Sequence, residues 1–215
     1  MNEIILMSDP RVAAVRVEEC DEPLVDCRSA LRVDQRRSDS AGDWAHVRAG
    51  VLQRLIRAQE LLPHGWQWLL VEGYRPPALQ ESIFNDYAAT LRRLHPEESE
   101  AHIRTAASRW VAPMETAGHV SGAAIDLTIC TQDGIEVDMG SPEAATPEES
   151  AGACYTHAAG LPAQAQQNRA VMIEALTAVG MVNYPTEWWH WSYGDRYWAM
   201  TTRSATAVYG PWYRG

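Results

Sequence analysis

The segment HVSGAAIDLTI, residues 119–129, decides how this chain is expected to fold. Ile125, Leu127 and Ile129 recur at every second position, which is the spacing of side chains on one face of a β-strand. Asp126 falls on the opposite face of the same strand. A carboxylate in such apolar company is costly unless it is paired or bound to a cation. The segment therefore predicts a strand with one hydrophobic face toward the core and a polar site on its other face.

Two short motifs supply the groups for that site, and each contains a histidine. His119 stands seven residues before Asp126, and Glu187 stands three residues before His190 in TEWWHW. Two imidazoles and one carboxylate are three of the four ligands of a catalytic zinc site, in which water takes the fourth position. The spacing favours such a site at His119, Asp126 and His190. The alternative is that each of them is an ordinary core or surface residue.

Glu187 reaches the same site only if the chain around it is not a regular strand. Residues three apart in a strand point to opposite faces, so Glu187 and His190 meet only if the chain bends or if Glu187 precedes the strand. Pro185, just upstream, favours this arrangement. An unligated carboxylate beside a zinc-activated water can accept its proton and pass it to a leaving amine.

The rest of the chain alternates helical and strand-like patterns. Branched and aromatic residues predict a buried strand over residues 66–75. Apolar residues at helical spacing predict helices over residues 44–62, 78–95, 97–110 and 163–179. Helices and strands without a repeat or a linker indicate a single α+β domain.

Turn signals divide the second half of the chain. Asp133-Gly134 between two strand-like runs predicts a hairpin. Residues 141–163 are rich in Pro, Glu, Ala, Ser and Gly, and predict a long loop beside a site. The aromatic segment 181–199 is expected to close the chain as strand and turn.

The expected domain spans residues 1–215. Residues 1–40 are interpreted as a less regular N-terminal extension packed on it, with short strands at residues 3–7 and 13–17.

Composition excludes several classes of protein. Hydrophobic residues make up 46% of the 215 residues, enough for a substantial core. The net charge is −10, from 18 basic and 28 acidic residues, which argues against partners such as nucleic acid or anionic membranes. No leader-like start or membrane-length apolar run is present, so a cytoplasmic location is expected. The four cysteines form no C-x-x-C pair and are interpreted as scattered thiols: Cys20, Cys27, Cys130 and Cys154.

Five segments, in this order, resemble the zinc-dependent D-alanyl-D-alanine dipeptidases. They are EGYRPPALQ (72–80), HVSGAAIDLT (119–128), DMGS (138–141), NR (168–169) and NYPTEWWHWSYGDRYWA (183–199). The resemblance implies a compact α+β domain with a central antiparallel sheet flanked by helices. It also implies one Zn²⁺ per chain and a small peptide substrate, free D-Ala-D-Ala, cleaved in the cytoplasm.

The same resemblance assigns roles to individual residues. His119, Asp126 and His190 match the three zinc ligands, and Glu187 matches the catalytic base. Arg75 matches the arginine that stabilises the developing oxyanion, a role that suits a rigid, permanently charged guanidinium.

Other positions carry weaker expectations. From the residues alone, a structural salt bridge between Arg75 and Glu72 is favoured. Ser121, Tyr155 and Trp189 are candidates for substrate binding. Gly122, between the first ligand and the strand, allows either a tight turn or close packing.

Two departures from the family leave the substrate open. Ala117 stands where the resistance-type dipeptidases have a serine, and Glu143 is the nearest acid where a Phe-Asp-like pair usually follows DMGS. The alternatives are therefore a DD-carboxypeptidase or another zinc amidase of the same fold. A catalytically silent metal-binding recognition domain is the alternative from another class.

Overall fold

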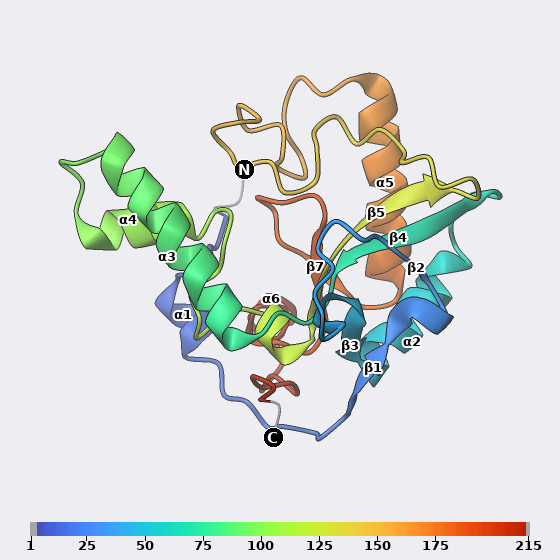
Figure 1. Ribbon diagram of the computed structural model, residues 1–215, viewed down its shortest axis with the longest axis horizontal. Coiled ribbons are helices and arrows are strands. Elements are labelled where there is room, and N and C mark those ends of the chain that lie inside the picture. The colour runs from blue at the N-terminus through green and yellow to red at the C-terminus, as the bar shows by residue number, and fades with distance from the viewer. Residues whose placement is uncertain (1–3, 214–215) are drawn as a thin grey trace.

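A computed structural model describes residues 4–213 as an α+β fold around a five-stranded sheet (Figure 1). The strands are β1 (Leu24–Asp26), β2 (Arg32–Val33), β3 (His46–Arg48), β4 (Trp66–Glu72), β5 (Ala124–Thr131), β6 (Val182–Asn183) and β7 (His190–Ser192). The α-helices are α1 (Pro10–Ala13), α2 (Ala49–Gln59), α3 (Pro77–Leu94), α4 (Glu100–Ala107), α5 (Ala163–Ala178) and α6 (Arg196–Thr202). The 3-10 helices are η1 (Cys27–Ser29), η2 (Asp43–Ala45) and η3 (His119–Ser121).

The central sheet has the order β2-β4-β5-β7-β6, and it is mixed rather than antiparallel. Strand β5 pairs antiparallel with both β4 and β7, and β6 pairs antiparallel with β7. The expectation of a purely antiparallel sheet is wrong at one edge, where β2 runs parallel to β4. The chain between these two strands contains α2, and a parallel pair needs such a long crossover connection.

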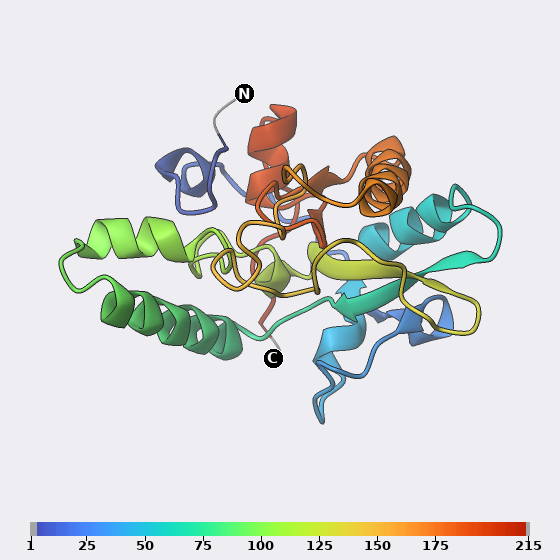
Figure 2. The same ribbon diagram turned by 90° about the horizontal axis from the view of Figure 1, so that it is seen from above.

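One face of β5 forms the centre of the hydrophobic core. Ile125, Leu127 and Ile129 are fully buried and belong to one cluster with apolar residues of α2 and α5. Trp68 and Leu70 of β4 add to this cluster. Figures 1 and 2 show α3 and α4 at the opposite end of the molecule from α2 and α5. The burial of Ile125, Leu127 and Ile129 confirms the predicted hydrophobic face of the 119–129 segment.

Most predicted elements are present close to their expected bounds. Helices α2 to α5 match the four ranges with helical spacing, and β4 falls in the predicted strand. The helix predicted from residue 44 begins only at Ala49, because residues 46–48 form β3 and pair with β1. Gly180 follows α5 with φ +81°, the left-handed conformation that ends many helices. The hairpin at Asp133-Gly134 is confirmed by a hydrogen bond of 2.9 Å from the Thr131 amide to the Ile135 carbonyl. Residues 141–160 contain no helix or strand, as expected of a long loop.

The two ends of the described chain differ from expectation. Residues 4–7 and 13–17 form no strand, and residue 3 lies outside the described residues. Met7 and Val12 pack instead against Tyr184 and Tyr197 in a separate small cluster.

Near the C-terminus, the expectation of only strand and turn over residues 181–199 is wrong at its end, because α6 begins at Arg196. The Asp195 side chain caps this helix by accepting a hydrogen bond of 2.7 Å from the Trp198 amide.

The segment before residue 40 is tied to the rest by pairing as well as packing. Strand β1 pairs antiparallel with β3, and β2 joins the central sheet.

All four cysteines are free, and only Cys20 is exposed. Within the described residues, every helix is too short or too polar to span a bilayer.

Replacing Leu127 by alanine tests whether this face of β5 is the centre of the core. The side chain is 0% exposed, so Leu127→Ala should lower the free energy of unfolding by about 2–5 kcal/mol. Urea denaturation measures this change. As a control, Leu79→Ala at a 47% exposed helix position should change it by less than about 0.5 kcal/mol. Equal effects at both positions would contradict the assignment of the core face.

Candidate metal centre

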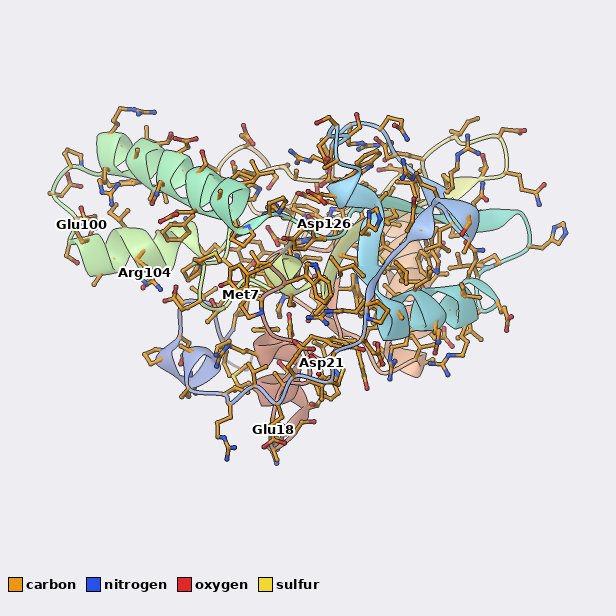
Figure 3. The ribbon with its side chains drawn as sticks, turned by 60° about the horizontal axis from the view of Figure 1, so that its bottom comes forward. Met7, Glu18, Asp21, Glu100, Arg104 and Asp126 are labelled. Carbon is orange, nitrogen blue, oxygen red and sulfur yellow. The ribbon has the colours of Figure 1, made fainter. Side chains whose placement is uncertain are left out.

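The pairing of β5 with its two neighbours brings three ionisable residues side by side. Asp126 stands opposite Glu72 in β4 and opposite His190 in β7. All three are buried, on the face of the sheet away from the Ile125 side chain. Figure 3 shows Asp126 near the middle of the molecule. Strand register therefore places an acid and a potential ligand on either side of Asp126.

His119 comes to the same place from a tight turn before β5. It begins η3, and Gly122 ends this turn with φ +67°. A Cβ on Gly122 would also lie 2.2 Å from the Leu24 side chain, so both the turn and the close packing require glycine here. The His119 Nδ1–H donates to the Gly73 carbonyl at 2.7 Å, which leaves Nε2 free to act as a ligand.

Three donor atoms converge at distances that suit one tetrahedral cation. His119 Nε2 lies 3.2 Å from His190 Nδ1 and 3.4 Å from Asp126 Oδ1. Asp126 Oδ1 lies 3.0 Å from His190 Nδ1. Ligands at about 2.0–2.1 Å from a tetrahedral zinc ion lie about 3.3 Å from one another. The residues present thus fit a zinc ion. Hydrogen bonds among them cannot satisfy every donor atom, because His119 Nε2 and Asp126 Oδ1 are both acceptors and face each other.

The protonation of these residues also suits ligands. Burial acts to raise the pKa of Asp126, but the two histidines hold it well below its usual value. Burial lowers the pKa of His190, although Asp126 opposes the shift. An ionised aspartate and a neutral imidazole are the forms that bind a metal ion.

Glu187 meets the cluster because the chain turns before β7. Its amide donates to the Tyr184 carbonyl at 2.9 Å, and the His190 amide donates to the Glu187 carbonyl at 3.3 Å. This turn places Glu187 Oε2 3.8 Å from His190 Nδ1. Burial and the neighbouring Asp126 raise the pKa of Glu187 well above its usual value, against the opposing charge of Arg75.

Arg75 forms the salt bridge with Glu72 that the residues alone favoured. Its Nε and one terminal nitrogen donate to the Glu72 carboxylate at 2.8 and 2.6 Å, and the other terminal nitrogen donates to Gln80 at 2.8 Å. It also lines the cavity beside the cluster. A guanidinium has five N–H groups, so two remain for a ligand in the cavity.

The cluster opens on a cavity of about 50 Å³, several times the ~10–15 Å³ that one water needs. Of the three candidates for substrate binding, Trp189 lines this cavity. The Ser121 hydroxyl donates to the Gly118 carbonyl at 2.7 Å and lines a different, smaller cavity. Tyr155 lines a third cavity, on the side of α6. The structure therefore brings only Trp189 of these three to the metal cluster.

Sequence reasoning did not single out two polar residues of this cavity. Gln80 belongs to the EGYRPPALQ segment, and its place in the same short motif as Arg75 was the available sequence signal. Arg37 lines the cavity from the loop between β2 and η2, a segment without any periodic pattern. Ala117 also lines the cavity.

One arginine of α5 holds the long loop over this region. Arg169 donates to the Met139, Ala153 and Tyr155 carbonyls at 2.7, 2.8 and 2.6 Å. The first carbonyl stands just before the irregular segment 141–160, and the other two lie in its second half. The loop is therefore fixed to α5 through its backbone.

The fold and the cluster together define an α+β protein with a buried His-Asp-His set able to hold a metal ion. A family model, peptidase M15, described as D-ala-D-ala dipeptidase, matches residues 47–207. The chain belongs to this family, and it is accordingly a peptidase.

Two relatives and two solved structures illustrate the likeness. A D-alanyl-D-alanine dipeptidase of Synechocystis sp. is 28% identical over 219 residues, covering 86% of this chain and 87% of the relative. A D-alanyl-D-alanine dipeptidase of Escherichia coli is 35% identical over 72 residues, covering 34% and 35%. A structure of VanYB in complex with D-alanine-D-alanine has a TM-score of 0.47 at 16% identity, covering 90% and 91%. The LdcB LD-carboxypeptidase has a TM-score of 0.47 at 16% identity, covering 86% and 75%.

Substitution of the ligands tests the cluster directly. Protein stripped with a chelator should rebind one zinc ion per chain, measured by calorimetric titration and elemental analysis. His190→Ala and Asp126→Ala should each weaken binding by more than the ~10- to 100-fold typical of a change in a ligand's hydrogen-bond partner. The exposed His157, replaced by alanine, serves as the control and should bind normally. Full zinc binding by the Asp126 variant would refute this centre.

Proposed function

We propose that this protein is a zinc-dependent dipeptidase that hydrolyses D-alanyl-D-alanine or a similar D-amino-acid dipeptide in the cytoplasm. His119, Asp126 and His190 hold the ion, Glu187 is the general base, and Arg75 stabilises the oxyanion. Family membership and the D-alanyl-D-alanine dipeptidase relatives support the substrate class.

The observation that carries the proposal is the set of distances among three buried donor atoms. They lie 3.0–3.4 Å apart, close to the edge of a zinc tetrahedron, and a further carboxylate stands 3.8 Å from one of them. Three protein ligands leave the fourth position open, as in catalytic rather than structural zinc sites.

Glu187 is suited to move a proton in this setting. A zinc ion bound at the cluster would polarise the peptide carbonyl and lower the pKa of a water to about 7. Glu187 then accepts a proton from the attacking water at its carboxylate and donates it to the departing amine. A carboxylate beside the attacking water can serve in both steps, first as base and then as acid.

Arg75 is suited to stabilise charge on the carbonyl oxygen. The bidentate contact with Glu72 and the bond to Gln80 hold the guanidinium in one orientation. Its two remaining N–H groups are thereby preorganised and need no rearrangement as the oxyanion develops. The salt bridge is thus part of the proposed catalytic role rather than an alternative to it.

Glu187→Gln separates the chemical step from metal binding. The amide cannot accept the proton, so kcat for D-Ala-D-Ala should fall by roughly 100- to 10,000-fold. Zinc content, measured by elemental analysis, should stay at one ion per chain. Glu174→Gln, at an exposed position of α5, should retain normal turnover. Near-normal activity of the Glu187 variant would exclude it as the base.

A DD-carboxypeptidase is the second candidate, and one observation favours it. Ala117 supplies no hydroxyl to the cavity wall at the position where the resistance-type dipeptidases have serine. Without this hydroxyl, the cavity wall offers the substrate one hydrogen bond fewer, so the hold on the two ends of a dipeptide differs from that in the resistance-type enzymes.

Comparing D-Ala-D-Ala with its N-acetyl derivative distinguishes the two candidates. A strict dipeptidase requires the free amine, so we expect acetylation to lower kcat/KM by at least about 10-fold, because the buried groups that hold the amine are left unpaired. Liberated D-alanine is the readout for both compounds. Equal or faster cleavage of the acetylated compound would favour the carboxypeptidase.

A further inference from the structure

The cavity beside the metal cluster contains two arginines, and only one of them is neutralised by a close partner. Arg75 makes a bidentate contact with Glu72 at 2.6 and 2.8 Å. Arg37 lies in the wall of the same cavity, and its side chain is 40% exposed. The charge of Arg75 is therefore offset by a hydrogen-bonded carboxylate, whereas the charge of Arg37 is not.

The N–H groups of the Arg37 guanidinium are available to bind a ligand. Within residues 4–213 its side chain makes no hydrogen bond, and its ion pair is with Glu143, whose Oε1 lies 3.9 Å from the Arg37 guanidinium. A charge-assisted hydrogen bond is about 1 Å shorter than this. Glu143 is itself buried and Oε1 has no hydrogen-bond partner in this part of the chain. The contact keeps Arg37 near the cavity without occupying its N–H groups.

The charge of Glu143 offsets that of Arg37 only in part. Burial, together with the nearby Asp126, raises the pKa of Glu143 to about 7. Glu143 is also shared, because its Oε2 lies 3.8 Å from the Arg36 guanidinium, so its charge is divided between two arginines.

The loop that carries Arg37 is held in a defined conformation. Asp39 accepts hydrogen bonds from the backbone amides of Ala41, Asp43 and Trp44 at 2.7, 3.2 and 3.1 Å. The Trp44 indole N–H also donates to the Asp34 carbonyl at 2.8 Å. Arg37 lies between these two held points, Asp34 and Asp39, so the fold fixes where its backbone stands relative to the cavity.

The other charges around the cavity show what such a cation is suited to meet. Asp126 and Glu187 both line the cavity and are acidic. Zinc bound at the cluster would balance these two acids, and Arg75 is already paired with Glu72, so Arg37 is the cavity-wall cation that can still pair with a substrate carboxylate. An arginine fork matches a carboxylate in shape and can donate two parallel hydrogen bonds.

We propose that Arg37 binds the C-terminal carboxylate of the peptide and thereby selects substrates with a free C-terminus. This inference rests on the proposed peptidase function and names the residue that recognises one end of its substrate. It makes Arg37 a specificity-determining residue that takes no part in proton transfer.

The test compares Arg37→Gln with Arg36→Gln, using D-Ala-D-Ala and its C-terminal amide as substrates. Arg36 is the matched control, because it shares the ion pair with Glu143 but is also engaged by Asp34 and Glu136 and does not line the cavity. Arg37→Gln should raise KM for the acid by roughly 10- to 100-fold and leave KM for the amide within about twofold. Arg36→Gln should change neither value by more than about twofold. Arg37→Lys, which keeps the charge but not the fork, should restore part of the loss.

A binding measurement makes the result independent of turnover. D-Ala-D-Ala is titrated calorimetrically into zinc-loaded Glu187→Gln protein, with and without Arg37→Gln, and the second change should weaken binding by a similar factor. Equal KM values for the two arginine variants would overturn the role of Arg37 while leaving the peptidase proposal intact. Absence of both turnover and binding in the otherwise unchanged protein would instead overturn the proposed function, and the carboxylate site with it.

Discussion

The structure depends on one constraint: β5 is hydrogen-bonded on both edges, so its side chains have only two directions available. One direction is taken by Ile125, Leu127 and Ile129, which form the core with α2 and α5. The other direction is taken by Asp126. Because the side-chain repeat of a strand is two residues, a slip of one position would bury the aspartate in the core and expose the apolar residues to the cavity. Core packing therefore also fixes the position of the metal ligand.

The second constraint is charge. Asp126 and Glu187 are two acids buried within a few ångströms of the same imidazole. Their neighbour Glu72 is neutralised by Arg75 at hydrogen-bonding distance, whereas Asp126 lies 4.0 Å from the same guanidinium and neither acid has an arginine at hydrogen-bonding distance within residues 4–213. A divalent cation would carry the two positive charges that balance them. The pKa shifts of the two acids differ in direction because Asp126 faces the imidazoles, whereas Glu187 faces Asp126.

Much of this arrangement follows from the sequence, because it is written in short-range patterns. The alternation in 119–129 predicts the two faces of β5, and Pro185 points to the bend that turns Glu187 toward His190. The elements that were missed depend on other signals. Strand β2 has two residues, and its parallel pairing is decided by a distant partner. Helix α6 has its signal in the capping residue Asp195, which the aromatic strand-like run around it obscured.

The cavity wall was the least predictable part, because loops bring its residues together. Arg37 comes from a turn built by Asp39, and Gln80 comes from the start of α3. No periodicity relates these positions to the metal ligands. Side chains held by loop geometry can be recognised only once the loops are placed, whereas ligands on paired strands can be inferred from spacing.

The way α5 holds the long loop has a consequence for how this protein can diversify. Arg169 grips segment 139–155 by main-chain oxygens, which every amino acid possesses. Point changes within the loop can therefore alter what faces the substrate and yet leave the anchoring bonds in place. The side chains of this loop can thus vary without loss of its anchor, provided that the Arg169 guanidinium is kept.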